Sequence, residues 1–101
     1  MIEGDDRVPK AYILITEDVK DPEKFAEYGK LAGKAMAGAT LLAFDPSPQP
    51  LEGEWHGPQT VLLEFESEEA ARAWYESDAY QEAATIRQSA ADCNGVIVKG
   101  M

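Results

Sequence analysis

The segment from Asp45 to Pro58 concentrates side chains that could do chemistry. It holds the only histidine of the chain, His56, directly after Trp55, together with two carboxylates, Glu52 and Glu54. An imidazole titrates near neutral pH and can serve as a general acid or base, so His56 is a catalytic candidate. The alternative is an exposed loop histidine without a role. Because the segment has neither helical nor strand periodicity, it predicts a long loop, and such loops are often functional.

The neighbours of His56 leave two further interpretations open. Trp55 could line a ligand pocket or anchor the loop against the sheet. Glu52, Glu54 and His56 stand at alternate positions and could bind zinc or manganese if the segment were extended. Glycines at 53 and 57 work against a regular strand, and the spacing matches no established metal motif, so we predict no metal site.

Arg87 is the most unusual charge in the C-terminal half. It follows Tyr80 by seven residues and Ala84 by three, which places all three on one face of a predicted helix. An arginine at a pocket rim can bind a carboxylate with two parallel hydrogen bonds. The structural alternative is a buried stem with a head group paired to Asp92 or Glu82. The single cysteine, Cys93, is predicted to be a small buried hydrophobe rather than a nucleophile.

We predict that five side chains from distant parts of the sequence converge on one cleft between the helices and the sheet. A cleft that is mostly aromatic, with one cation and one titratable group, suits a small organic acid or an aromatic compound. His56 would be the catalytic candidate, and the ligand-binding candidates are Tyr28, Trp55, Tyr80 and Arg87.

The elements that would position these residues follow from periodicity and capping. Asp21 and Pro22 suit the start of a helix, and Ser67 and Ser77 suit the caps of two further helical segments. Residues 1–9 are polar and predict a mobile arm, which leaves 10–101 as a single domain. The expected strands cover 11–16, 40–44, 59–65 and 95–100, and the expected helices begin at 22, 68 and 79.

This order, βαββαβ with a split second helix, predicts an α+β fold of the ferredoxin-like kind with an antiparallel sheet. Right-handed crossovers place all the helices on one face of that sheet. The first strand, however, is apolar on both alternations, with Tyr12 and Leu14 on one face and Ile13 and Ile15 on the other. One apolar sheet face would stay bare, so we expect a second copy to cover it, sheet to sheet, in a homodimer.

Composition excludes several classes of function. The formal net charge is -10, and no lysine or arginine occurs between Lys34 and Arg72. Nucleic-acid binding needs cations at the phosphates, so no nucleic-acid partner is expected. No apolar run reaches the length of a membrane span, and the first residues contain no signal-peptide pattern. With one cysteine and no such pattern, the chain is expected in the cytoplasm.

Several stretches resemble a known family. They are AYILITEDVKDPEKFAEY, LEGEWHGP, VLLEFESEEAARAWYESDAYQ and the terminal VIVKG. In combination they are similar to the domain of unknown function 1330 family, within the dimeric α/β-barrel superfamily, over about residues 10 to 100. The resemblance implies a ferredoxin-like dimer with no established activity. The superfamily includes cofactor-independent monooxygenases, isomerases and haem enzymes, so the fold alone does not define chemistry.

Two functions remain open on the sequence. The first is a small-molecule-binding homodimer, with or without cofactor-independent enzymatic activity on a small organic acid or aromatic compound. The second is a non-enzymatic dimeric binding or scaffolding module. No cofactor is predicted, because a single histidine in a loop does not by itself indicate an axial haem ligand.

Overall fold

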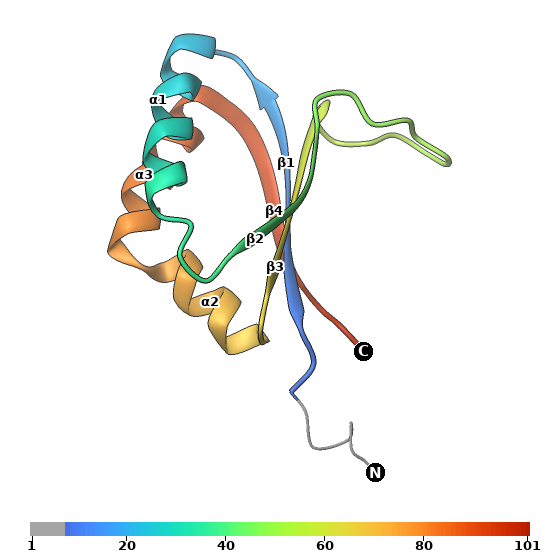
Figure 1. Cartoon of the computed structure of the whole chain (residues 1–101). Helices are drawn as coiled ribbons and strands as arrows, with labels where there is room; N and C mark the ends of the chain where they lie inside the picture. Colours follow the sequence, from blue (N-terminus) through green and yellow to red (C-terminus); the bar gives the residue numbers. More distant parts are fainter. Residues whose placement is uncertain (1–7) are drawn as a thin grey trace.

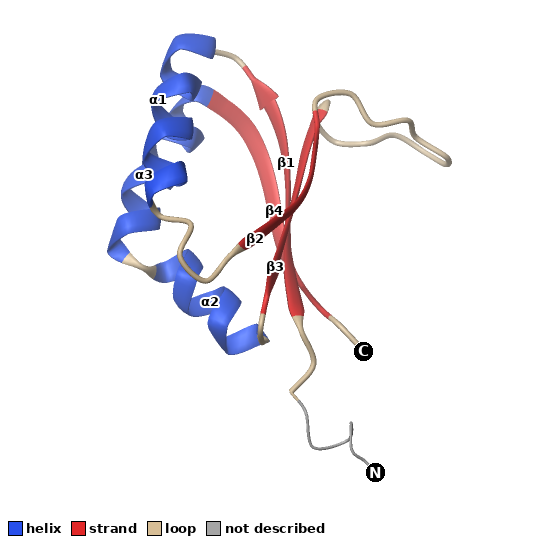
Figure 2. Ribbon diagram, viewed as in Figure 1, coloured by secondary structure: helices blue, strands red, loops and turns tan. Residues whose placement is uncertain are grey.

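The computed structural model describes residues 8–101, so the arm predicted over residues 1–9 lies outside the described residues apart from its last two positions. Helices form one layer and the sheet forms the other (Figures 1 and 2). The elements, in chain order, are β1 (Ala11–Val19), α1 (Pro22–Lys34), β2 (Thr40–Asp45), β3 (Gln59–Phe65), α2 (Glu68–Glu76), α3 (Asp78–Ala90) and β4 (Ala91–Lys99). The four strands pair antiparallel in the order β2-β3-β1-β4, which confirms the ferredoxin-like α+β fold.

The predicted helix starts are confirmed by side-chain caps. The backbone N–H of Lys24 donates to Asp21 Oδ1 at 3.2 Å, and Pro22 occupies the first turn. The Ser67 hydroxyl accepts from the N–H of Ala70, and the Ser77 hydroxyl accepts from Tyr80 N at 3.2 Å. Each cap satisfies an N–H group that has no partner within its own helix. The break at Ser77 splits the second helical region as expected.

The end of β1 and the start of β4, which pair with each other, extend further than periodicity predicts. The prediction ended the first strand at Thr16 and began the last at Gly95, whereas pairing continues to Val19 opposite Ala91. The polar residues Asp92 to Asn94 hide this extension, because they break the apolar pattern of a strand. Cross-strand hydrogen bonds compensate, since a backbone ladder depends little on side-chain type.

The core lies between the sheet and the helices. Ile13, Ile15 and Phe65 from the sheet pack against Trp74 of α2 and Tyr80 of α3. The Trp74 ring lies 5.3 Å from Phe65 and 4.0 Å from Tyr80, measured between ring centroids. Helix α1 packs only at the edge of this cluster, through the half-buried side chains of Tyr28, Leu31 and Ala32.

The opposite sheet face, which we call the outer face, has no helix over it in the described chain. The strand register places Leu14 between Leu62 and Val96 on this face, with Tyr12 and Val98 beside them. Val96 is 53% exposed and Val98 is 46% exposed. The prediction that helices cover one of two apolar faces is therefore confirmed. The loop between β2 and β3 also leaves the sheet on this side (Figure 1).

Candidate functional site

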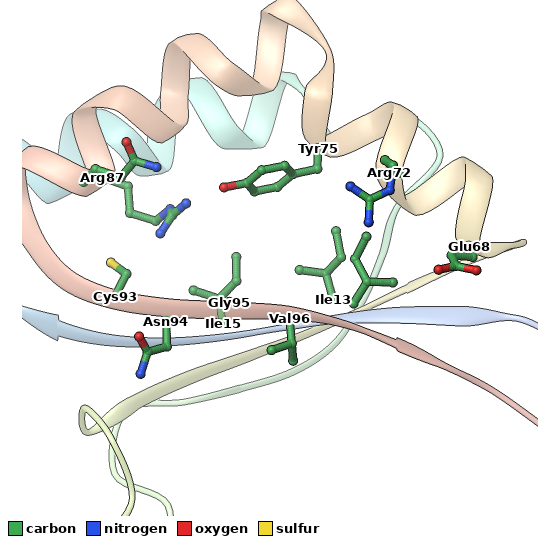
Figure 3. A pocket seen from close by; sticks show the side chains of 12 residues that line it. Ile13, Ile15, Glu68, Arg72, Tyr75, Arg87, Cys93, Asn94, Gly95 and Val96 are labelled. Atoms are coloured by element: carbon green, nitrogen blue, oxygen red, sulfur yellow. The ribbon is translucent and has the colours of Figure 1, made fainter.

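A cleft of about 500 Å³ lies between the helices α2 and α3 and the strands β1 and β4. Figure 3 shows Arg87 and Cys93 at one end, Tyr75 along the helical wall, and Arg72 with Glu68 at the other end. The sheet side of the cleft is apolar around Ile13, Ile15 and Ile97. A volume of this size is in the range of small-molecule sites. We call this space the helix-side cleft.

Arg87 is buried at one end of the helix-side cleft. It is 4% exposed and lies in the last turn of α3, where the helix dipole favours a cation. Its Cζ atom is 5.9 Å from the centre of the Tyr28 ring. Within residues 8–101 no carboxylate forms an ion pair with Arg87, and its buried Nε has no hydrogen-bond partner. The alternative of a pair with Asp92 or Glu82 is therefore wrong for this part of the chain.

Arg87 keeps its positive charge at any pH at which the protein is folded. Burial lowers the pKa of the guanidinium, but Tyr80, the Cys93 thiol and Tyr28 more than offset burial, and the pKa is raised. Burial also raises the pKa of Cys93, and Arg87 lowers it only in part. The cleft thus holds a cation beside a thiol whose pKa is raised, and a raised pKa disfavours the nucleophilic thiolate.

Glu17 is a buried carboxyl group beside this end of the cleft, and the sequence analysis missed it. It pairs with Cys93 across the β1–β4 ladder and is 1% exposed. Gln59 Nε2 donates to Glu17 Oε1 at 2.9 Å, while Oε2 has no partner among the described residues. Burial raises the pKa of Glu17, and the hydrogen bond from Gln59 and the charge of Arg87 oppose the rise. The alternation of side chains along the first strand could have predicted this burial, because it places Glu17 on the same face as Ile15, two residues earlier.

Tyr28 and Tyr80 lie together behind Arg87. Their hydroxyl oxygens are 3.0 Å apart, so one donates to the other. Tyr80 is fully buried, and burial raises the pKa of Tyr28. Neither tyrosine is among the residues that line the helix-side cleft. The structure therefore brings three of the predicted ligand-binding residues together, but only Arg87 faces the cleft.

Trp55 and His56 lie on the other side of the sheet. Thr16 Oγ1 is 2.9 Å from His56 Nδ1, and Trp55 Nε1 donates to Thr60 Oγ1 at 2.8 Å. Thr16 and Thr60 pair across the outer face, so both aromatic side chains are held there. With Leu14 and Val96 among their neighbours, they border a shallow hollow of about 300 Å³.

The prediction that all five candidates converge on one cleft is therefore wrong within one protomer. The cause is the path of the loop, which brings Gly57 close to the β1 backbone at Glu17. A Cβ atom at this position would lie 2.8 Å from the Glu17 carbonyl carbon, and the backbone φ is +71°. Glycine permits both the close approach and this conformation. This path places His56 on the outer face, away from Arg87.

The part of the chain that the structure describes contains no group of three His, Cys, Asp or Glu side chains that could hold a metal ion. Within residues 8–101, no helix is long and apolar enough to cross a membrane.

Replacing Glu17 by glutamine tests the effect of its burial. The folded-state pKa lies above the ordinary value of 4.5, so the folded chain binds protons more tightly than the unfolded chain. The free energy of unfolding should therefore fall as pH rises from about 4.5 through the folded-state pKa, and then level off. Glutamine keeps an acceptor for Gln59 but cannot ionise. In urea titrations from pH 5 to 8, Glu17→Gln should gain stability over wild type as pH rises.

The control for this prediction is Glu82→Gln, at an exposed position on α3. Its difference from wild type should stay flat over the same pH range. A flat difference for Glu17→Gln as well would contradict the burial argument.

Solved structures of similar fold come from several organisms. A protein of unknown function from Rhodopseudomonas palustris has a TM-score of 0.75 at 20% identity, covering 94% of this chain and 85% of its own. A dimeric ferredoxin-like protein of unknown function from Jannaschia sp. CCS1 has a TM-score of 0.72 at 14% identity, covering 88% and 97%. SnoaB, a cofactor-independent oxygenase from Streptomyces nogalater, has a TM-score of 0.64 at 12% identity, covering 93% and 95%. At these identities the likeness shows the fold alone.

No curated protein matches this sequence. A family model does match, over residues 10–101, and its description is "Domain of unknown function (DUF1330)". This match covers nearly the whole chain and includes every helix and strand of the fold. The chain therefore belongs to the domain of unknown function 1330 family.

Proposed function

We propose that this protein binds a small organic acid in the helix-side cleft, with Arg87 as the group that meets the carboxylate. The observation that carries the proposal is a buried guanidinium without a carboxylate partner in the described chain. Leaving a charge buried and unpaired costs several kcal/mol. A ligand carboxylate would supply the missing partner through a charge-assisted, two-pronged contact. The apolar sheet wall and Tyr75 would hold the body of the ligand.

The proposal includes a homodimer joined through the outer faces. The apolar side chains on this face, among them Leu14, Val96 and Val98, have no cover from the helices. A continuous apolar surface of this kind usually marks an interface. The structurally similar protein from Jannaschia sp. CCS1 is described as dimeric, which supports the same assembly here. Trp55 and His56 would then lie at one end of the interface, where His56 stays a candidate acid or base.

Cofactor-independent catalysis in the cytoplasm is the form of activity that we propose for the cleft. Support comes from the Glu17 carboxyl beside the cleft, because burial raises its pKa and so favours a form that can donate a proton, and from SnoaB, which is described as a cofactor-independent oxygenase. The alternative is a non-enzymatic dimeric binding or scaffolding module. The broad apolar outer face favours that alternative, because formation of the dimer would then be the main role of the protein.

Ligand binding is tested by replacing Arg87 with alanine. A charge-assisted bidentate contact contributes about 1.5–3 kcal/mol, so affinity for small carboxylic acids should fall about tenfold to a hundredfold. The measurement is a calorimetric titration of wild type and Arg87→Ala with propionate, hexanoate and benzoate, with melting scans of both proteins.

Arg72→Ala is the comparison variant. Arg72 stands at the open end of the cleft, exposed and 3.5 Å from Glu76, and exposed pairs contribute at most about 1 kcal/mol. Its loss should weaken binding far less than the loss of Arg87. A wild type that binds none of the acids, together with a strongly destabilised Arg87→Ala, would identify a structural arginine instead.

A further inference from the structure

Gly95 leaves a gap in the sheet wall of the helix-side cleft. It pairs with Ile15 across the β1–β4 ladder, so a side chain at this position would point toward the helices. Cys93 and Ile97, two residues before and after it, carry side chains on the same face and line the same cleft. The side chains of Cys93 and Ile97 therefore line the cleft on both sides of Gly95, and Gly95 itself has no side chain to fill the space between them.

The backbone does not require glycine at position 95. Its φ is outside the left-handed region, which among the described glycines is occupied by Gly38, Gly53 and Gly57. A Cβ atom would meet Ile15 Cγ1 at 3.6 Å, an ordinary van der Waals distance. Glycine inside a strand also destabilises it by about 0.5–1 kcal/mol relative to alanine. What glycine provides here is space in the cleft.

The wall opposite this gap is aromatic. Figure 3 shows the Tyr75 ring across the cleft from Gly95 and Ile15, with its hydroxyl directed toward Arg87. The space between Tyr75 and Gly95 is thus a slot with two apolar sides and a cation at one end. Flat rings stack on aromatic side chains in offset geometry, and such contacts contribute about 0.5–1.5 kcal/mol beyond area burial.

We propose that Gly95 is a specificity-determining residue that admits a flat, ring-bearing carboxylic acid into this slot. The ring lies between Tyr75 and Gly95, and the carboxylate meets Arg87. The inference rests on the proposed function, because it assumes that the cleft binds an acid, and it goes further by naming the class. A short aliphatic acid needs only the Arg87 end of the slot, so its affinity should not depend on residue 95. A puckered ring of equal carbon number should fit the slot less well than a flat one.

The test fills the gap in two steps, with Gly95→Ala and Gly95→Val. The probes are benzoate, cyclohexanecarboxylate and propionate, titrated calorimetrically into wild type and both variants. Wild type should bind benzoate more tightly than cyclohexanecarboxylate. Gly95→Ala should weaken benzoate binding severalfold and Gly95→Val at least tenfold. Propionate affinity should stay within about twofold of wild type in both variants.

The melting temperatures of the same variants show whether the fold is kept. A β-branched residue in a strand interior should hold or raise the melting temperature. Gly29→Ala is the matched control: it adds a methyl group on α1 that would meet no atom within 4 Å beyond its chain neighbours and the nearby backbone of its own helix, and it should not change benzoate affinity.

The outcomes separate this inference from the proposed function. Benzoate that binds wild type and Gly95→Val equally, but not Arg87→Ala, would overturn the slot and keep the acid site. Weakening of propionate and benzoate to the same degree would overturn it as well, because residue 95 would then act through Arg87. Failure of wild type to bind any of the three acids would overturn both.

Discussion

Replacement of Leu14 by glutamate should convert the proposed dimer into a monomer. Leu14 lies on β1, the inner strand between β3 and β4, and its neighbours on the outer face are Leu62 and Val96. A carboxylate at this position would be buried without a partner in a sheet-to-sheet interface. That burial costs several kcal/mol, which is comparable to the whole free energy of unfolding of a small domain. Light scattering over a micromolar concentration range should give a monomer mass for the variant and a dimer mass for wild type.

The control for this prediction puts the same charge on the helical side of the molecule. Ala26 is exposed on α1, so Ala26→Glu should leave the dimer intact. A monomer mass for wild type throughout the range would refute the dimer itself. A dimeric Leu14→Glu would show that another surface joins the copies.

The largest effect on stability should come from Trp74→Ala. The indole packs between Phe65 and Tyr80, and its Nε1 donates to the carbonyl of Ala35 at 2.6 Å, which ties α2 to the end of α1. Truncation of a buried tryptophan removes apolar contacts and leaves a cavity, at a cost of about 3–5 kcal/mol. Urea unfolding should show this loss as a lower midpoint with a similar slope.

Trp55→Ala is the matched control for that measurement. Trp55 is 48% exposed, and within residues 8–101 its side chain makes one hydrogen bond, to Thr60. Its removal should lower the free energy of unfolding by about 1 kcal/mol, the typical value of one such bond. Equal losses from the two tryptophans would contradict the assignment of Trp74 to the core and Trp55 to the surface.

The fold was predictable because its signals are local. Alternation in the first strand and the caps at Asp21, Ser67 and Ser77 depend on residues within one turn or one strand. Arg87 could be singled out for a similar reason, since a cation on a face shared with Tyr80 and Ala84 stands out in a helical pattern. Local rules erred by a few residues where pairing continued without an apolar pattern, as it does from Asp92 to Asn94.

The sequence by itself determined the elements, the two apolar sheet faces and the arginine at the end of the last helix. Only the tertiary structure decided which of the chemical side chains meet. The register sets Glu17 beside Cys93, and Gly57 sends His56 to the outer face, away from Arg87. The physical reason is range: periodicity and capping act over a few residues, whereas cross-strand register and the path of a long loop depend on contacts between distant segments.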